Sequence, residues 1–315
     1  METAIRVRTD AARFEQAAAL LPYDLRQAAC KMPERDKARA EEFRLRAGRP
    51  PMVAGPAGER EIPHCPGPVR PEDLGLVLEV ASRASAHTVL DRVKCGFVTV
   101  RGGHRVGICG SAVVRDGEIH NLRQMSSLAI RIAHEVPGAA AGVLPKLLDG
   151  GKLHSTLLLS PPGGGKTTLL RDLVRCISDG VGMEALRVGL ADERGEVAAM
   201  YEGVPQVDVG ERTDVMDGCP KGAALAMLLR GMNPQVLAAD EITAAEDIEA
   251  LEQAAGCGVA LLCTAHGGSL RDLWTRPLYR RLMDAGLFRR VVLIRAGEAG
   301  RHYEVTEPER GEWLC

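Results

Sequence analysis

Residues 157–168 read LLLSPPGGGKTT, an aliphatic run that stops at two prolines and continues into three glycines, a lysine and two threonines. The aliphatic residues are typical of a buried strand, and the LLRDLVRCI that follows is typical of a helix. Consecutive glycines allow backbone N–H groups to turn toward an anion. The N-terminus of the following helix adds a partial positive charge. The stretch therefore predicts a phosphate-binding loop of the Walker A type between a strand and a helix.

The residue types of this loop assign its roles. Lys166 is expected to reach the β- and γ-phosphates of ATP, and the Thr167 hydroxyl to ligate Mg²⁺. The pattern G-x-x-x-x-G-K-[ST] expects glycine at position 160, where this chain has Ser160. We expect Ser160 to tighten the turn and leave the phosphate cradle intact; an incidental glycine-rich turn is the alternative. The predicted nucleotide-binding residues are Pro162, Gly163, Gly164, Gly165, Lys166, Thr167 and Thr168.

A second element, VLAADEI at residues 236–242, consists of apolar residues that end in two carboxylates. A strand of this kind delivers Asp240 to its carboxyl end, where it can hold a water on Mg²⁺. Glu241 is then placed to polarise the attacking water. A strand followed by an acidic turn is common, but its place after the loop in an alternating pattern strengthens this Walker B interpretation. The predicted metal-binding residues are Thr167 and Asp240.

Two further strand ends carry polar residues. LLCTAHGG at residues 261–268 ends in Thr264 and His266, and we expect His266 to sense the γ-phosphate, with a purely structural histidine as the alternative. VGLADERGEVAAM at residues 188–200 contains Asp192, Glu193 and Glu196. This acidic cluster either supports Mg²⁺ and the water network or only caps a helix. The predicted catalytic residues of these elements are Lys166, Glu193, Glu241 and His266.

The chain changes character near residue 140, which predicts two domains, 1–140 and 141–315. In the first, residues 11–42 suit short helices broken by Pro22 and Pro33. Residues 42–55 read as two strands joined by a turn, 55–70 as loop, 71–83 as a helix, and 96–135 as antiparallel strands with turns at 102–103 and 116–117. We expect an α+β domain.

The second part alternates apolar strands with helical segments. This pattern predicts an α/β domain with a mostly parallel, doubly wound sheet. The expected strands are residues 156–159, 187–191, 236–239, 260–263 and 291–295.

Composition limits the function classes. The net charge is −2, the pI is about 6.5 and aromatic residues make up 3%, which argues against nucleic-acid partners. The basic stretch RDKARAEEFRLRAGR keeps a nucleic-acid-dependent ATPase as an alternative, and a nucleotide-gated scaffold without hydrolysis is another. The nine cysteines form no C-x-x-C pair, which indicates reduced thiols in a cytosolic protein. No signal peptide or membrane-spanning segment is expected.

The chain resembles the secretion-superfamily ATPases in the order of these four elements. The phosphate loop comes first, followed by the acidic cluster, the strand that ends in Asp240 and Glu241, and the strand that ends in His266. Within this superfamily the chain is similar to a family that acts in endospore formation, over nearly its whole length. The most specific stretches are LADERGEVAAM, VGERTDVMDGCPKGAALAMLLRGMNPQVLAADEI and TAHGGSL. In the first domain, EFRLRAGRPP, GFVTVRGGHRVGICG and MSSLAIRIAHE also match.

The resemblance implies a RecA-like P-loop ATPase that uses ATP and Mg²⁺ and works as a homo-hexameric ring. It implies a place in the mother-cell cytoplasm, at the membrane proteins of the channel to the forespore. It also implies that arginines of the N-terminal domain or a neighbouring subunit reach the phosphates, where a guanidinium stabilises the transferring group. Arg105 and Arg123 are the predicted catalytic arginines; Arg131, Arg212 and Arg230 are further candidates.

Overall fold

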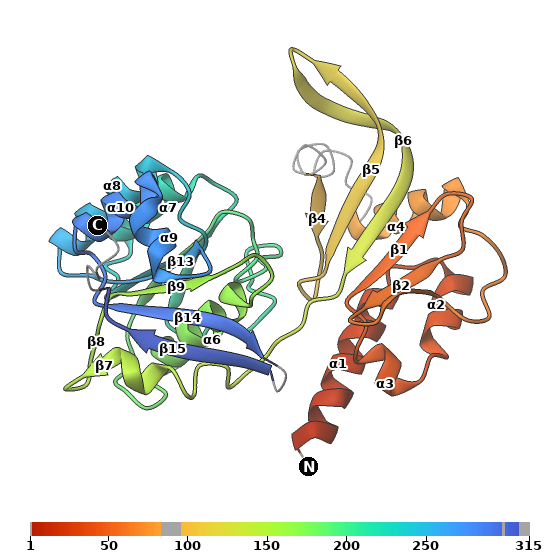
Figure 1. Cartoon of the computed structure of the whole chain (residues 1–315). Helices are drawn as coiled ribbons and strands as arrows, with labels where there is room; N and C mark the ends of the chain where they lie inside the picture. The colour runs from red at the N-terminus through yellow and green to blue at the C-terminus, as the bar shows by residue number, and fades with distance from the viewer. Residues whose placement is uncertain (1, 83–95, 298–299, 309–315) are drawn as a thin grey trace. The chain divides into compact units, whose positions relative to one another are not determined.

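The computed structural model describes residues 2–82, 96–297 and 300–308 and divides the chain into two compact units (Figure 1). Unit 1 comprises Met1–His134 together with Ala199–Gln206. Unit 2 comprises Glu135–Ala198 and Val207–Cys315. The segment Ala199–Gln206 therefore leaves the second unit and returns to the first, where Gly102 N donates to Gln206 Oε1 (2.8 Å).

Unit 1 begins with three helices, α1 (Glu2–Ala18), α2 (Tyr23–Cys30) and α3 (Glu34–Lys37). The predicted breaks are confirmed, because Pro22 and Pro33 stand at the N-caps of α2 and α3. Proline fits there because the first turn of a helix does not need its N–H group. A fourth helix, α4 (Pro71–Ser82), begins at a proline in the same way.

The sheet of unit 1 is antiparallel, with the order β3-β2-β1-β6-β5-β4. The predicted loop at 55–70 is partly wrong, because β3 pairs with β2 there through a tight turn between Gly55 and Gly58. Every residue of β3 is exposed, so the sequence lacks the apolar alternation that marks a strand. The strands are β1 (Glu42–Arg46), β2 (Met52–Gly55), β3 (Gly58–Glu61), β4 (Phe97–Thr99), β5 (Arg105–Arg115) and β6 (Glu118–Arg131).

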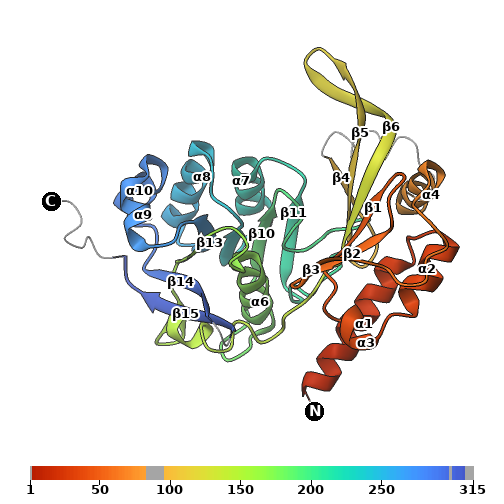
Figure 2. The same cartoon turned by 45° about the vertical axis from the view of Figure 1, so that its right-hand side comes forward.

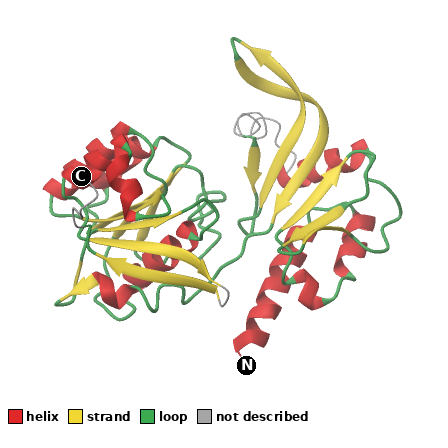
Figure 3. Cartoon of the chain, in the orientation of Figure 1, coloured by secondary structure: helices red, strands yellow, loops and turns green. Residues whose placement is uncertain are grey.

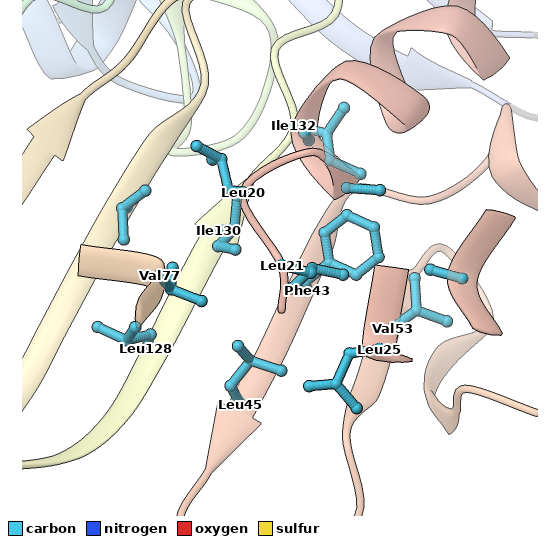
Figure 4. Close-up of a cluster of buried hydrophobic side chains, with 14 of the residues drawn as sticks. Leu20, Leu21, Leu25, Phe43, Leu45, Val53, Val77, Leu128, Ile130 and Ile132 are labelled. Carbon is cyan, nitrogen blue, oxygen red and sulfur yellow. The ribbon is translucent and has the colours of Figure 1, made fainter. Parts of the chain in front are cut away.

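The core of unit 1 lies between this sheet and its helices. Leu20, Leu21 and Leu25 from the helical region pack toward Phe43 and Ile130 on β1 and β6 (Figure 4). With few aromatic residues available, branched aliphatic side chains fill this space, as the composition predicts.

Unit 2 is built on a seven-stranded sheet with the order β11-β10-β12-β13-β9-β14-β15 (Figures 2 and 3). All neighbouring strands are parallel except the terminal β14–β15 hairpin. This confirms the predicted α/β class with a mostly parallel sheet. The strands are β9 (Thr156–Ser160), β10 (Val188–Asp192), β11 (Thr213–Asp217), β12 (Val236–Ala239), β13 (Ala260–His266), β14 (Arg290–Gly297) and β15 (Gly300–Thr306).

Helices cover both faces of this sheet (Figure 2). Leu157 and Leu159 of β9 belong to the core cluster that includes α7 (Lys221–Gly231), α8 (Ala245–Gly256) and the short α9 (Leu270–Thr275) and α10 (Pro277–Asp284). The helix α6 (Lys166–Asp179) contacts β9, β10 and β13. Because the central strands are parallel, the carboxyl ends of β9, β12 and β13 meet at one edge of the sheet. That edge is where the polar residues of the predicted site follow their strands.

Two strands of the seven-stranded sheet were not predicted from the sequence. β11 contains TDVMD and pairs with β10 at one edge, and β15 contains GRHYEVT and pairs with β14 at the other. Edge strands are less buried than central strands and can carry polar residues. A search for apolar runs therefore does not detect them. No helix among the described residues is long and apolar enough to cross a bilayer.

One buried histidine makes unit 1 sensitive to acid. The His104 side chain is fully buried, and its Nδ1 accepts a hydrogen bond from Ala133 N (3.1 Å). Burial, which is the largest cause, and the charges of Arg13 and His134 together lower the pKa of His104 to about 4. Between that value and the ordinary 6.5, the unfolded chain binds a proton that the folded chain does not. The folded state therefore loses stability as the pH falls through this range.

We predict that the free energy of unfolding of unit 1 decreases by about 3 kcal/mol between pH 6.5 and 4, from this one group. Hydrogen exchange of the β1 and β6 amides, corrected for the intrinsic pH dependence of exchange, measures it. His104→Gln should flatten the slope, whereas the exposed His120→Gln should keep it. Equal slopes in wild type and His104→Gln would contradict the prediction.

Candidate functional site

The loop between β9 and α6 has the backbone that an anion cradle requires. Gly164 N donates to Pro161 O (3.1 Å), which closes a turn with Gly163 at φ 72°. Gly165 follows at φ 97° as the N-cap of α6. These left-handed conformations suit glycine, since a side chain would be strained there. The sequence therefore needs glycine at both positions in order to aim the N–H groups of the loop and of the first helical turn.

Ser160 replaces the first glycine of the pattern and tightens the turn, as its sequence suggested. Its hydroxyl donates to Pro161 O (2.9 Å). A Cβ placed on Gly164 would lie 2.4 Å from Ser160 Oγ, so the serine occupies the space beside this glycine. The departure from the pattern changes the entry to the loop and leaves the later positions free to bind.

Lys166 lies at the centre of the site and is buried, with 4% of its surface exposed. Its Nζ donates to His266 Nδ1 (3.0 Å) and approaches Ser160 O and Pro161 O (3.3 Å each). Burial lowers the pKa of Lys166, while the carboxylates of Glu241 and Asp240 oppose this shift. The ammonium group is thus held by neutral acceptors, and phosphate oxygens would be stronger partners for it.

Asp240 joins two strand ends and the start of a helix. Its carboxylate accepts hydrogen bonds from Thr167 Oγ1 (2.7 Å) at the start of α6 and from Thr264 Oγ1 (2.5 Å) on β13. Burial raises the pKa of Asp240, and the two hydroxyl donors counteract the shift. A hydroxyl beside a carboxylate is a donor set that suits Mg²⁺. No cluster of three or more His, Cys, Asp or Glu side chains suited to a metal occurs within the described ranges.

Glu241 has a strained backbone that its neighbours hold in place. Its φ is 53°, a left-handed value that costs a non-glycine residue roughly 1–3 kcal/mol. Glu241 N donates to Thr264 Oγ1 (2.8 Å), and Glu241 O accepts from Lys221 Nζ (2.7 Å). Its carboxylate lies 2.8 Å from His266 Nε2 and 2.9 Å from Arg194 Nη1. The strain therefore serves to aim this carboxylate across the edge of the sheet.

His266 connects the loop lysine to this carboxylate. An ammonium group can only donate, so His266 Nδ1 must accept from Lys166 and the ring proton sits on Nε2, where it points to Glu241. The four side chains Lys166, His266, Glu241 and Arg194 form one continuous polar chain. A change in the partner of Lys166 would therefore reach Glu241 through the imidazole ring of His266.

The acidic cluster after β10 divides into two roles. The Asp192 carboxylate accepts hydrogen bonds from the backbone N–H groups of Glu196, Val197 and Ala198, so it shapes the loop. This role is structural, but it is not the helix capping that the sequence offered as the alternative, because turns and no helix follow at residues 193–200. Glu193 instead reaches the site, where its Oε2 accepts from Lys221 Nζ (3.1 Å).

Sequence reasoning missed three members of the site: Arg194, Lys221 and Thr264. Lys221 is 4% exposed and joins Glu193, the backbone of Glu241 and, at 3.7 Å, Asp247. It follows Pro220 at the first position of α7, inside one of the stretches that carry the family resemblance, but no residue pattern there assigns the lysine a role. Thr264 was noted on its strand but given no role. Arg194 and Lys221 line a polar cavity at the site. Its other lining residues are Asp192, Glu193, Glu196, Asp240, Glu241 and Thr243.

The predicted arginines lie elsewhere in the chain. Arg105, Arg123 and Arg131 belong to unit 1, where Arg105 stacks 3.7 Å above the Phe97 ring and Arg131 lies 3.6 Å from Glu42. In unit 2, Arg212 and Arg230 donate to the backbone carbonyls of Ala185 and Ala226. A part in catalysis stays a prediction for all five arginines. Thr168 lines a different cavity, beside Arg171 and Asp172.

Comparison with known proteins identifies the family of the chain. The family described as sporulation stage III, protein AA, matches residues 11–314. Stage III sporulation protein AA of Bacillus subtilis is 39% identical over 286 residues, which cover 88% of this chain and 89% of that protein.

Solved structures show the same fold at low identity. The Legionella pneumophila ATPase DotB aligns with a TM-score of 0.57 at 14% identity, over 87% of this chain and 78% of that one. The pilus retraction motor PilT, solved with bound ADP, aligns with a TM-score of 0.58 at 18% identity, over 87% and 81% of the two chains. Unit 2 thus has the RecA-like architecture expected from the sequence.

We predict that Lys221→Met lowers the free energy of unfolding by about 3 kcal/mol, because it leaves Asp247, Glu193 and the Glu241 carbonyl without their buried cation. Urea denaturation followed by Trp274 fluorescence measures it. Lys152→Met, on an exposed position of the same unit, is the control and should change stability little. Equal effects of the two substitutions would contradict the role assigned to Lys221.

Proposed function

The chain belongs to the sporulation stage III, protein AA family, and on that premise we propose that it is an Mg²⁺-dependent ATPase of the secretion type. One observation carries the proposal: the polar chain Lys166–His266–Glu241 lies beside the Thr167–Asp240 pair, at the end of a glycine cradle. A cation, a hydroxyl–carboxylate pair and a second carboxylate are the groups that phosphoanhydride hydrolysis requires.

Binding would begin at the loop. The N–H groups of Gly163 to Thr168 and the Lys166 ammonium would hold the phosphates of ATP, and Thr167 with Asp240 would hold Mg²⁺, directly and through water. When bound, the metal would neutralise charge on the β- and γ-phosphates. Lys166 would then exchange its carbonyl and imidazole partners for phosphate oxygens, which releases His266 Nδ1.

Glu241 is the residue we assign to water activation. Its side chain is 19% exposed and lines the polar cavity, from which a water molecule can reach it. Arg194 and His266 hold its two oxygens, one each, and a water molecule has to replace one of these contacts. The strained backbone keeps the carboxylate in place during this exchange, because Thr264 and Lys221 fix its N–H and carbonyl groups.

The wider role follows from the family and is part of the same proposal. We assign the protein to a homo-hexameric ring that energises assembly of, or transport through, the channel between mother cell and forespore. Such a ring would sit peripherally on membrane proteins of that channel, on the mother-cell side. Arg105 or Arg123 of unit 1 would complete the site from the same or a neighbouring subunit. Nucleic acid is not an expected partner, given the net charge of −2.

Two substitutions test the chemistry. Glu241→Gln keeps the shape of the side chain but removes the base, so we predict that kcat falls by at least about a hundredfold while ATP still binds. Lys166→Ala should abolish binding and hydrolysis together. Steady-state phosphate release and a fluorescent-nucleotide titration measure the two effects. Normal turnover by a correctly folded Lys166→Ala protein would refute the proposal.

Assembly is tested separately by light scattering with and without a non-hydrolysable ATP analogue. We predict that the analogue with Mg²⁺ shifts wild-type protein toward six copies and leaves Lys166→Ala unchanged. A mass that stays at one copy at high protein concentration, with nucleotide demonstrably bound, would contradict the ring.

A further inference from the structure

An arginine of the terminal hairpin lies against the phosphate loop. β14 runs parallel to β9 with Leu293 opposite Leu159, and it continues to Gly297, past the point where β9 gives way to the loop. β15 then returns, and Arg301 pairs with Ala296 in this overhanging part of the hairpin. The order of the strands therefore carries residues near the C-terminal end of the chain back to a loop more than a hundred positions earlier.

The contact between Arg301 and the loop is close. A Cβ placed on Gly165 would lie 2.4 Å from Arg301 Nε and 2.6 Å from its Cζ, so the guanidinium packs directly on the Cα of this glycine. Gly165 is the N-cap of α6 and immediately precedes Lys166. Glycine is needed here for its φ of 97° and also because any side chain would displace Arg301.

Arg301 differs from the other arginines near this edge of the sheet in having no hydrogen-bond or ion-pair partner among the described residues. Arg194 pairs with Glu241, Arg276 donates to His266 O, and Arg295 lies 3.5 Å from Glu304. Within the part of the chain that the structure describes, Arg301 makes no hydrogen bond or ion pair, although it is exposed. This guanidinium adds positive charge to a loop that already has a lysine and a helix N-terminus, and no carboxylate among the described residues pairs with it.

We propose that Arg301 binds the phosphate chain of the nucleotide held by the loop of its own subunit. This inference rests on the proposed ATPase function and adds to it a phosphate ligand from the C-terminal hairpin. A guanidinium presents several donors in a fixed plane, which suits contact with phosphate oxygens on the outer side of the loop, while Lys166 contacts them from within. The site would then be closed by β15 as well as by β9, β12 and β13.

The test is direct binding to full-length protein, with ADP and with inorganic tripolyphosphate as probes in Mg²⁺ buffer. Arg301→Ala is expected to raise the Kd for both probes by about tenfold, the size of one charge-assisted hydrogen bond. Arg301→Lys should recover part of the loss. The control is Arg295→Ala, which removes a cation from the same hairpin and should leave both Kd values unchanged.

Each other outcome decides against the inference. If Arg301→Ala binds both probes like wild type while Lys166→Ala does not, the inference is wrong and the ATPase proposal stands. If Arg301→Ala weakens ADP but not tripolyphosphate, Arg301 contacts the nucleoside and the phosphate assignment is wrong. An equal loss in Arg295→Ala would assign the effect to general charge. If wild type binds neither probe, the ATPase proposal fails with it.

Discussion

The hydrogen bonds of one carboxylate hold the site of this protein together. Asp240 accepts from Thr167 at the start of α6 and from Thr264 on β13, while it follows β12 itself. These two bonds fix the phosphate loop, the carboxylate strand and the histidine strand to one another. They are possible only because the central strands are parallel, so that their carboxyl ends meet at one edge. The same two hydroxyl groups stabilise the charged form of Asp240 and so counteract the rise in its pKa that burial causes.

Charge balance explains how the site can respond to a ligand. Lys166 is buried and held by acceptors that are weaker than phosphate, and Glu241 has an ion-pair partner at each oxygen. Because His266 contacts both residues, a change of partner at Lys166 would alter the surroundings of Glu241 through the imidazole ring. Binding and water activation would in this way be coupled over two hydrogen bonds, supported by the rigid strand ends.

The sequence predicted the parts of the site that depend on local pattern. Lys166, Thr167 and Asp240 were found because a glycine loop and an apolar run ending in acids carry their chemistry in adjacent residues. Lys221 and Arg301 could not be found in this way, since they reach the site through the start of α7 and the return of β15. The parallel sheet was predictable from its apolar strands, whereas β3, β11 and β15 were not, because exposed or edge strands carry little apolar signal. The return of Ala199–Gln206 to unit 1 likewise has no local mark.

The central claim is that Lys166 exchanges its internal partners for the phosphates of a nucleotide in the glycine cradle. A crystal structure of the protein grown with Mg²⁺ and a non-hydrolysable ATP analogue tests it most directly. We predict phosphate oxygens within hydrogen-bonding distance of Lys166 Nζ, Mg²⁺ on the Thr167 hydroxyl, and His266 Nδ1 no longer bonded to the lysine. A cradle without nucleotide, with Lys166 still on His266 and Asp240 turned away from any metal, would contradict it.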